Sequence, residues 1–355
     1  MNRNSDKLKV LIVGSWRWPQ YEQAFAKGMQ EHGVNVIALR TAPFFTGSTG
    51  RLQLKIPFLG PAMMRHNRQI IEVADAQRPD WILFWRPTHI LPGTLRRLKT
   101  LGLCLASYNN DDPFGPQAHG NVPWHHHLLW HWYIKCLPTF DRNFFYRRVN
   151  CDEALAKGAR RADVMLPYFI PKKDRPVELN SSEKAKYGAD VTFVGHYEPD
   201  GREKSIRALI GASVKLKIWG GHYWSRKVLG DLYGRLQPIV PAEGDDYAKA
   251  LCGAKICLAF LSKLNRDTYT RRCFEIPACG RLMLAERTSD LTQMFKEDEE
   301  ACFFSSDEEL VQKVRWLLEN PKERERIAEA GMRRVWADGH DVESRAEQFI
   351  NNLQL

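Results

Sequence analysis

The sequence predicts an α/β protein of two doubly wound, Rossmann-like domains that face one another. Short apolar runs of strand length alternate with helix-period segments along most of the 355 residues, a pattern typical of parallel sheets with helices on both faces. This alternation is interrupted at 171–190, which is polar, holds two prolines and shows no periodicity. The composition, with 44% hydrophobic and 26% charged residues, is that of a globular protein.

The first half opens with a β-α-β unit, in which KVLIVG (9–14) runs into a glycine turn and a helix-period segment follows. We expect strands of this half at 9–14, 34–39, 81–85, 103–108 and 163–168. The first domain then spans 1–170, and the polar segment 171–190 is the linker.

The second half repeats the alternation. We expect strands at 191–195, 216–219, 255–260 and 282–285, and helices at 202–210, 246–252 and 268–280. The sequence from 308 onward is helical, and Asn320-Pro321 marks a helix start because proline is favoured at the first helical position. The second domain then spans 191–338, and a C-terminal helix at 339–355 crosses back to pack on the first domain.

The net positive charge of the chain lies entirely in its first half. Residues 1–168 hold 22 Lys and Arg against 12 Asp and Glu, whereas the remainder holds 30 of each. This asymmetry indicates an anionic partner, which is a phosphate-bearing ligand, a membrane surface or a nucleic acid, although basic residues also serve solubility alone.

The apolar runs, the N-terminus and the cysteines indicate the cellular compartment of the protein. No run of about 18 apolar residues predicts a membrane span, and the N-terminus does not resemble a secretory signal. The eight cysteines include no CxxC pair, which favours reduced thiols. We therefore expect a cytoplasmic protein, and leave open a peripheral contact with the inner face of an anionic membrane.

Two strand ends of the second half are candidate ligand loops. After 191–194, Gly195 makes a turn and Arg202 opens a helix, a combination that suits a diphosphate. After 216–219, Trp219 and Gly220 offer an aromatic face and a close backbone approach for a nucleobase, although a packed aromatic turn gives the same pattern.

The segment TYTRRCFEIPACGRLMLAE (268–286) contains a carboxylate in an apolar setting. Burying Glu275 without partners is costly, and Arg271 stands one helical turn before it. A carboxylate here has the chemistry to accept hydrogen bonds from the two vicinal hydroxyls of a ribose. Gly280 is positioned to end the helix, and Pro277 indicates a short, distorted element.

The segment RRCFEIPACGRLMLAE and the residues after it resemble the C-terminal half of the group 1 glycosyltransferases, closest to their spore-maturation CgeB-like branch. The resemblance covers about 190–340, and the first half matches only through Asn110-Asp111-Asp112-Pro113 and Leu166-Pro167. It implies the GT-B fold, a nucleotide-diphosphate sugar as donor substrate, no metal and no other cofactor. The absence of an Asp-x-Asp motif after a strand agrees with metal independence.

The resemblance also assigns roles to residues. Glu275 would hold the donor ribose, Asp267 would contact the donor sugar, and Arg202 and Lys263 would bind the diphosphate. The family more often has Glu at the position of Asp267, and the spacing of the two carboxylates is that of the retaining branch. The full set of donor-binding candidates is Gly195, Arg202, Trp219, Gly220, Val240, Lys263, Thr270, Arg271 and Glu275.

The acceptor side is predicted from the loop that follows the strand at 103–108. Asp111 or Asp112 is a candidate to orient or deprotonate an acceptor hydroxyl, and the alternative is a turn capped by Asp before Pro113. The segment 124–148 interleaves eight aromatic residues with basic ones, which fits an acceptor groove, a lipid-facing surface or core aromatics. Its adjacent histidines lack ligand spacing, so we expect no metal site there.

These patterns leave several function classes open. The leading hypothesis is a hexosyltransferase-type enzyme acting on a hydroxyl acceptor, which is a glycan, a lipid-linked sugar or a protein. The same fold hosts nucleotide-sugar epimerases, and a sugar- or surface-binding protein without turnover is a further alternative. A dinucleotide oxidoreductase fits poorly because Gly14-Ser-Trp-Arg lacks the G-x-G-x-x-G motif and Arg40 replaces the acidic ribose ligand. No motif indicates nucleic-acid binding.

Overall fold

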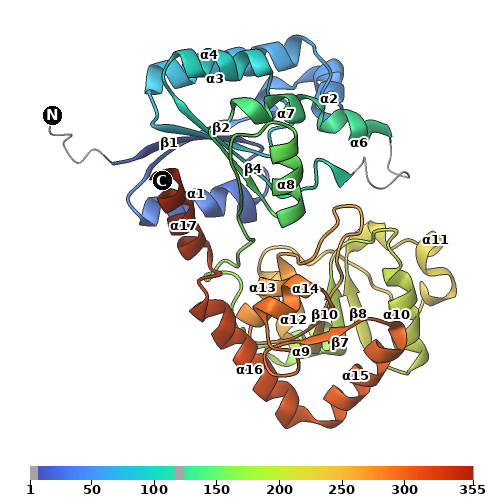
Figure 1. Cartoon of the computed structure of the whole chain (residues 1–355). Helices are drawn as coiled ribbons and strands as arrows, with labels where there is room; N and C mark the ends of the chain where they lie inside the picture. The colour runs from blue at the N-terminus through green and yellow to red at the C-terminus, as the bar shows by residue number, and fades with distance from the viewer. Residues whose placement is uncertain (1–6, 116–123, 355) are drawn as a thin grey trace. The chain divides into compact units, whose positions relative to one another are not determined.

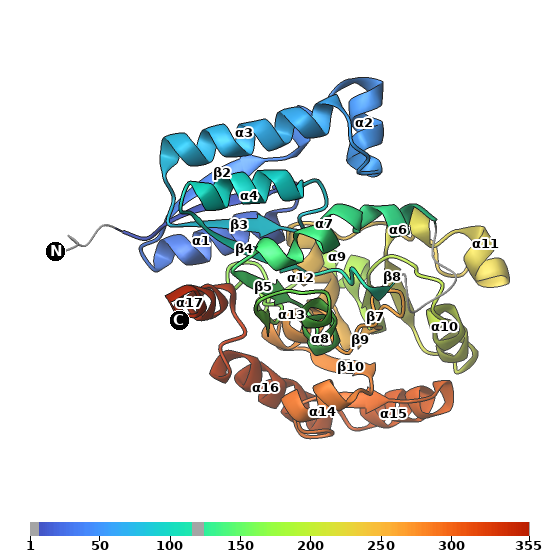
Figure 2. The ribbon, with the colours of Figure 1, turned by 45° about the horizontal axis from the view of Figure 1, so that its top comes forward.

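The computed structural model describes residues 7–115 and 124–354. The chain divides into two compact units, shown in Figure 1 and, turned, in Figure 2. The first unit holds the described residues up to Leu166 together with those from Val342 onward, and the second holds Pro167–Asp341. Each unit is built on its own parallel sheet.

The first unit contains a six-stranded parallel sheet in the order β2-β1-β3-β4-β5-β6. Its strands are β1 (Lys9–Gly14), β2 (Asn35–Arg40), β3 (Trp81–Trp85), β4 (Cys104–Asn109), β5 (Arg142–Phe145) and β6 (Ala162–Val164). The chain adds β2 on one side of β1 and then β3 on its other side. The carboxyl ends of β1 and β3 therefore flank a topological switch point, where ligands of such sheets bind.

Helices cover both faces of this sheet, with α3 and α4 on one face and α1 and α17 on the other (Figures 1 and 2). The helices are α1 (Ala24–Glu31), α2 (Gly47–Lys55), α3 (Pro61–Gln77), α4 (Pro92–Thr100), α6 (Trp124–Leu129), α7 (His131–Cys136), α8 (Arg148–Ala156) and α17 (Val342–Gln354), with shorter turns η1 (Pro19–Gln23), η2 (Ala42–Phe44) and η3 (Leu137–Thr139). The ring of Phe349 in α17 lies 5.4 Å from Phe25 and 4.9 Å from Phe144, which fixes the last helix to this unit.

The second unit contains a five-stranded parallel sheet in the order β11-β10-β9-β7-β8. Its strands are β7 (Ala189–Val194), β8 (Leu216–Trp219), β9 (Ala254–Ala259), β10 (Leu282–Glu286) and β11 (Cys302–Phe304). Its helices are α9 (Ser181–Tyr187), α10 (Arg202–Gly211), α11 (Arg226–Leu229), α12 (Asp245–Cys252), α13 (Arg272–Ala278), α14 (Ser289–Met294), α15 (Asp307–Glu319) and α16 (Pro321–Ala337), with turns η4 (Gly221–Tyr223) and η5 (Gly230–Leu232). Proline opens α16, as predicted.

Two of the differences from the sequence predictions concern helices of the second unit. The expected linker 171–190 lies in the second unit and carries α9, because Asn180 and Glu183 form a reciprocal capping box at its start. The helix expected from 268 begins only at Arg272, since Thr268 is tied outside the helix by its hydroxyl to Asp290 and by its carbonyl to Thr288. Gly280 ends that helix at φ +65°, as predicted.

The aromatic segment 124–148 is mostly core. Trp130, Tyr133, Phe140, Phe144 and Phe145 are each at most 3% exposed, so of the three alternatives for this segment, core aromatics describes these five rings. Helical and strand periodicity places these rings inward, and Trp124 alone among its tryptophans and tyrosines is strongly exposed, at 66%. Within 7–115 and 124–354, no helix combines the length and hydropathy needed to cross a bilayer.

Candidate functional site

A cavity of about 680 Å³ lies in the second unit beyond the carboxyl ends of β7, β10 and β11. Its wall includes Arg202, at the start of α10, and Lys263, in the loop after β9. The structure therefore brings together the two basic residues that the resemblance pairs on a diphosphate. The full lining is Tyr197, Pro199, Asp200, Gly201, Arg202, Glu203, Lys204, Ser205, Lys263, Glu286, Phe304, Ser305, Ser306 and Asp307.

The guanidinium of Arg202 is already bound by other groups of the protein. It forms an ion pair with Asp200 and donates to the carbonyl of His196 over 2.8 Å, and its side chain is only 2% exposed. Lys263 donates to the backbone carbonyl of Asp200 but remains exposed, as does Lys204. The lysines are thus the accessible cations of the cavity, whereas Arg202 stabilises the loop between β7 and α10.

Carboxylates also line this cavity. Burial raises the pKa of Glu286, whose Oε2 accepts the backbone N–H of Leu261 at 2.6 Å. Asp307 accepts from the hydroxyl of Ser205 at 2.5 Å. Carboxylate oxygens accept hydrogen bonds from hydroxyl groups, so this wall combines groups that suit a sugar with lysines that suit a phosphate.

The loops after β7 and β8 contact each other. The backbone N–H of Gly195 donates to Trp219 O over 2.9 Å, and a Cβ on Gly220 would lie 2.2 Å from Gly195 O. Trp219 is only 6% exposed, so its ring is packed and Tyr223, 54% exposed, is the accessible ring of this loop. Val240 is 41% exposed on the loop before α12.

Glu275 lies in a buried ionic cluster on α13. Its Oε2 accepts from the hydroxyl of Tyr247 at 2.5 Å, and its Oε1 is paired with Arg271. A second carboxylate, Asp174, lies 3.8 Å from the same guanidinium. Asp174 and Tyr247 were not identified from the sequence, because no local pattern links them to Glu275.

The guanidinium of Arg271 lies close to two carboxylates in this cluster, so negative charge exceeds positive charge there. Burial, followed by the charge of Glu275, raises the pKa of Asp174 to about 7. The same two causes raise the pKa of the Tyr247 hydroxyl, so it acts as a donor to Glu275. Glu275 does not line the 680 Å³ cavity, and its oxygens already hold internal partners while retaining lone pairs for further donors.

The two remaining donor-side candidates lie just before α13. The backbone N–H of Asp267 donates to Ser262 O over 2.9 Å, and its carboxylate accepts weakly from Ser262 N at 3.4 Å. The carbonyl of Thr270 accepts from Cys273 N at the start of the helix. Neither residue lines the 680 Å³ cavity.

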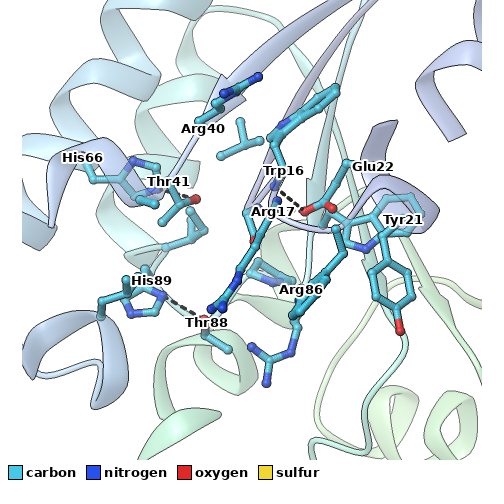
Figure 3. Close-up of a pocket in the computed structure, with 18 of the residues that line it drawn as sticks. Trp16, Arg17, Tyr21, Glu22, Arg40, Thr41, His66, Arg86, Thr88 and His89 are labelled. Atoms are coloured by element: carbon cyan, nitrogen blue, oxygen red, sulfur yellow. Dashed lines mark hydrogen bonds between the residues drawn. The ribbon is translucent and has the colours of Figure 1, made fainter. Parts of the chain in front are cut away.

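A larger cavity, of about 890 Å³, lies in the first unit at the carboxyl ends of β1 to β4 (Figure 3). Asp111 is on its wall and forms an ion pair with Arg86. Asp112 is not on the wall. It is 3% exposed, and its Oδ1 accepts from the amides of Phe114 and Gly115 and from Asn150. Of the two acceptor-side candidates, Asp112 therefore has the geometry of a turn-capping residue.

Three arginines on this wall were missed as a group. Arg17 follows β1 by three residues, Arg40 ends β2, and Arg86 follows β3 directly. The signal was present in the sequence, since an arginine stands at the end of each of the first three strands. The described residues contain no group of three or more His, Cys, Asp or Glu that could hold a metal ion.

Comparison with known proteins agrees with this architecture. Residues 202–351 match the family described as glycosyl transferase-like. Among curated proteins, none matches this sequence. HepE from Anabaena, solved with UDP and glucose, is similar in structure with 14% identity and a TM-score of 0.66, over 98% of this chain and 99% of that one.

Two other similar structures extend the comparison. Sucrose-phosphate synthase from Thermosynechococcus elongatus has 13% identity and a TM-score of 0.67, with 98% of each chain covered. A Listeria monocytogenes protein described as a UDP-N-acetylglucosamine 2-epimerase has 13% identity and a TM-score of 0.61, over 98% of this chain and 96% of that one. The segment 202–351 is thus glycosyl transferase-like in sequence, and the chain as a whole has the GT-B fold.

Proposed function

We propose that the protein is a metal-independent glycosyltransferase that moves a sugar from a nucleotide-diphosphate donor to a hydroxyl acceptor. The observation that carries this proposal is the family match at 202–351, which begins at the cavity residue Arg202 and spans Lys263, Asp267 and Glu275. Similar structures that hold UDP and glucose, or UDP-glucose, support a uridine nucleotide as the first donor to test. We also propose retention of configuration, on the spacing of Asp267 and Glu275, and the CgeB-like branch, on the motif 271–286.

The chemistry of transfer follows from the charges available. Cleavage of a glycosyl–phosphate bond builds negative charge on the departing diphosphate, and fixed cations stabilise that charge more than they stabilise the ground state. We assign this role to Lys263 and Lys204, the accessible cations of the cavity. Glu286 and Asp307 on the same wall are proposed to accept hydrogen bonds from the sugar hydroxyls.

We assign Glu275 to the donor ribose. Tyr247 and Arg271 hold its carboxylate in place and leave lone pairs for the ribose hydroxyls. Two hydrogen bonds to a charged acceptor contribute about 1.5–3 kcal/mol each. Loss of the carboxylate is therefore expected to weaken nucleotide binding by tenfold or more, about 1.4 kcal/mol.

The test is a panel of UDP- and GDP-sugars, read by thermal shift, by isothermal titration calorimetry and by slow hydrolysis of the donor. Glu275→Gln keeps the shape of the side chain and should lose nucleotide affinity. Glu299→Gln, on an exposed side chain of the same unit, should not. No response to any nucleotide would favour a binding protein without turnover. Release of an epimerised nucleotide sugar without acceptor would favour the epimerase alternative, which the similarity to the Listeria structure supports.

We further propose that the first unit contacts an anionic membrane through the hairpin of α2 and the start of α3. Four large apolar side chains of this hairpin are 39–56% exposed: Leu52, Phe58, Leu59 and Met64. Gln53 is buried between them, and its Oε1 accepts from the amides of Ala62 and Met63, which holds the hairpin closed and its apolar side chains outward.

The charge around this hairpin complements an anionic lipid surface. Arg51, Lys55, Arg65 and Arg68 are exposed on it, and the sequence holds no Asp or Glu from residue 32 to residue 71. Apolar side chains that enter the interface beside basic residues are the pattern of a peripheral membrane anchor. We therefore propose α2 and α3, rather than the mostly buried segment 124–148, as the elements that contact the membrane.

A further inference from the structure

The 890 Å³ cavity of the first unit has a positively charged wall built by three strand ends. Arg17, Arg40 and Arg86 line it, and each comes from a different strand of the sheet. In Figure 3 the side chains of Arg17 and Arg86 extend in the same direction, toward the part of the view that holds Thr88, while Arg40 lies at the other end of the view.

The loop that carries Arg17 is held in a strained conformation. Trp16 has a φ of +55°, in the left-handed region that non-glycine residues rarely adopt. The buried carboxylate of Glu22 compensates, because its Oε1 accepts the backbone N–H groups of Ser15 at 2.7 Å and Trp16 at 3.1 Å (Figure 3). A backbone strained in this way and fixed by a buried side chain is typical of a functional site.

The backbone at Arg86 is also in the left-handed region. Its φ is +48°, and its backbone N–H donates to Tyr108 O over 2.8 Å. Its guanidinium lies 5.2 Å from the ring of Trp130 and pairs with Asp111. Two adjacent strands, β1 and β3, are thus each followed by a left-handed residue at the edge of one cavity, and this edge is the switch point of the sheet.

The opposite wall is polar but uncharged. His66 and His89 are buried, and burial lowers the pKa of His66 to about 3 and of His89 to about 4, so both are neutral. His89 Nε2 faces the carbonyl of Gln53 at 3.1 Å and must donate to it, so Nδ1 accepts from the Thr88 hydroxyl at 2.8 Å. His66 is 0% exposed, and its Nδ1 has no partner among the described residues.

The charges of the cavity do not balance internally. Asp111 is paired with Arg86, and the Glu22 carboxylate is committed to two backbone amides. No ion pair of the described residues involves the guanidinium of Arg17 or of Arg40, and Arg17 lies 4.9 Å from the ring of Trp18. Two exposed arginines without a carboxylate partner in the described part of the chain therefore share this cavity with tryptophan side chains and with His66.

We infer that this cavity binds the anionic group of a phosphate-bearing ligand, with Arg17 and Arg40 as its cationic contacts and the tryptophan rings against its uncharged body. A free sugar phosphate and a lipid phosphate present the same chemistry to these residues. The assignment of this ligand as the acceptor rests on the proposed function, whereas its binding does not.

The test is isothermal titration calorimetry of the full chain with three probes: glucose 6-phosphate, dihexanoyl phosphatidic acid and the neutral methyl glucoside. We expect binding of at least one phosphate probe, weakened by rising salt, and none of the methyl glucoside. Arg17→Gln and Arg40→Gln should each weaken phosphate binding about tenfold or more, since a charge-assisted hydrogen bond is lost. Arg17→Lys should retain part of the affinity.

Arg96→Gln is the matched control, because Arg96 is exposed on α4 and lies outside the cavity. Binding of only the sugar phosphate or only the lipid phosphate identifies the source, and both results support the inference. Equal affinity for neutral and phosphate probes, unchanged affinity in both Gln variants, or no phosphate binding at millimolar concentration would overturn it. A parallel titration with the panel of UDP- and GDP-sugars separates the two proposals. Phosphate binding without a response to any nucleotide sugar would support this site and contradict the transferase proposal.

Discussion

Replacing Asp174 with asparagine should change how the stability of the protein depends on pH. Asp174 is 4% exposed, and burial together with the Glu275 charge raises its pKa from 3.8 to about 7. Between these two values the folded state binds a proton that the unfolded state has released, so the free energy of unfolding falls as the pH rises. A shift of about three pKa units corresponds to about 4 kcal/mol at most.

The assay is unfolding in guanidinium chloride, followed by tryptophan fluorescence, at several pH values from about 4 to about 8. Asparagine does not ionise in this range, and its side-chain oxygen still accepts the backbone N–H of Ile170, which lies 2.6 Å from Asp174 in the wild type. The wild type should therefore lose stability relative to Asp174→Asn as the pH rises through this window. Asp245→Asn, on an exposed residue of the same unit, should follow the wild type. A difference between wild type and Asp174→Asn that does not change with pH would refute the reasoning.

Three further predictions concern the first unit. Gly14→Ala would place a Cβ 2.5 Å from the Glu22 carboxylate, so we expect a loss of about 1–3 kcal/mol in the free energy of unfolding, measured by denaturant titration. Asp112→Ala leaves buried donors unsatisfied and should cost about 2–4 kcal/mol in the same measurement. Phe58→Ser combined with Leu59→Ser should reduce sedimentation with anionic phosphatidylglycerol vesicles about tenfold or more, because the exposed parts of both side chains would otherwise enter the bilayer.

Each of these changes has a matched control. Gly93→Ala adds a Cβ with nothing within 4 Å and should leave stability unchanged, so an equal loss in both glycine variants would contradict the contact with Glu22. Asp112→Asn retains an acceptor and should cost less than alanine. Leu155→Ser removes an exposed apolar side chain from α8 and should not affect vesicle binding, and neutral phosphatidylcholine vesicles should bind the wild type weakly. Equal binding to both vesicle types would exclude the electrostatic part of the membrane proposal.

The fold was predictable because strand periodicity is local. The strands at 81–85 and 216–219 agree with β3 and β8 to the residue, since each is a short apolar run bounded by turn residues. β5 and β11 were not predicted. β5 begins with a buried arginine and is flanked by further charges, and β11 has three residues, so neither shows a run long enough to recognise.

The site was less predictable because its partners come from distant segments. The sequence singled out Glu275 and Arg271, four residues apart on one helix, and the structure pairs them. The contributions of Asp174 and Tyr247 depend on tertiary packing, and no spacing reveals them. The buried ion pair that occupies Arg202 is equally invisible in the sequence, where only a basic residue at a helix start is apparent.

The return of α17 to the first unit has a consequence for the order in which the chain folds. The second unit is one continuous stretch of polypeptide, whereas the first lacks the helix that covers Phe25 and Phe144 until its last segment has been synthesised. During translation the second unit is therefore the first to have its complete sequence. The first unit keeps an uncovered aromatic surface until α17 has been synthesised. Truncation before Val342 is expected to leave that surface exposed and the first unit prone to aggregation, with the second unit intact.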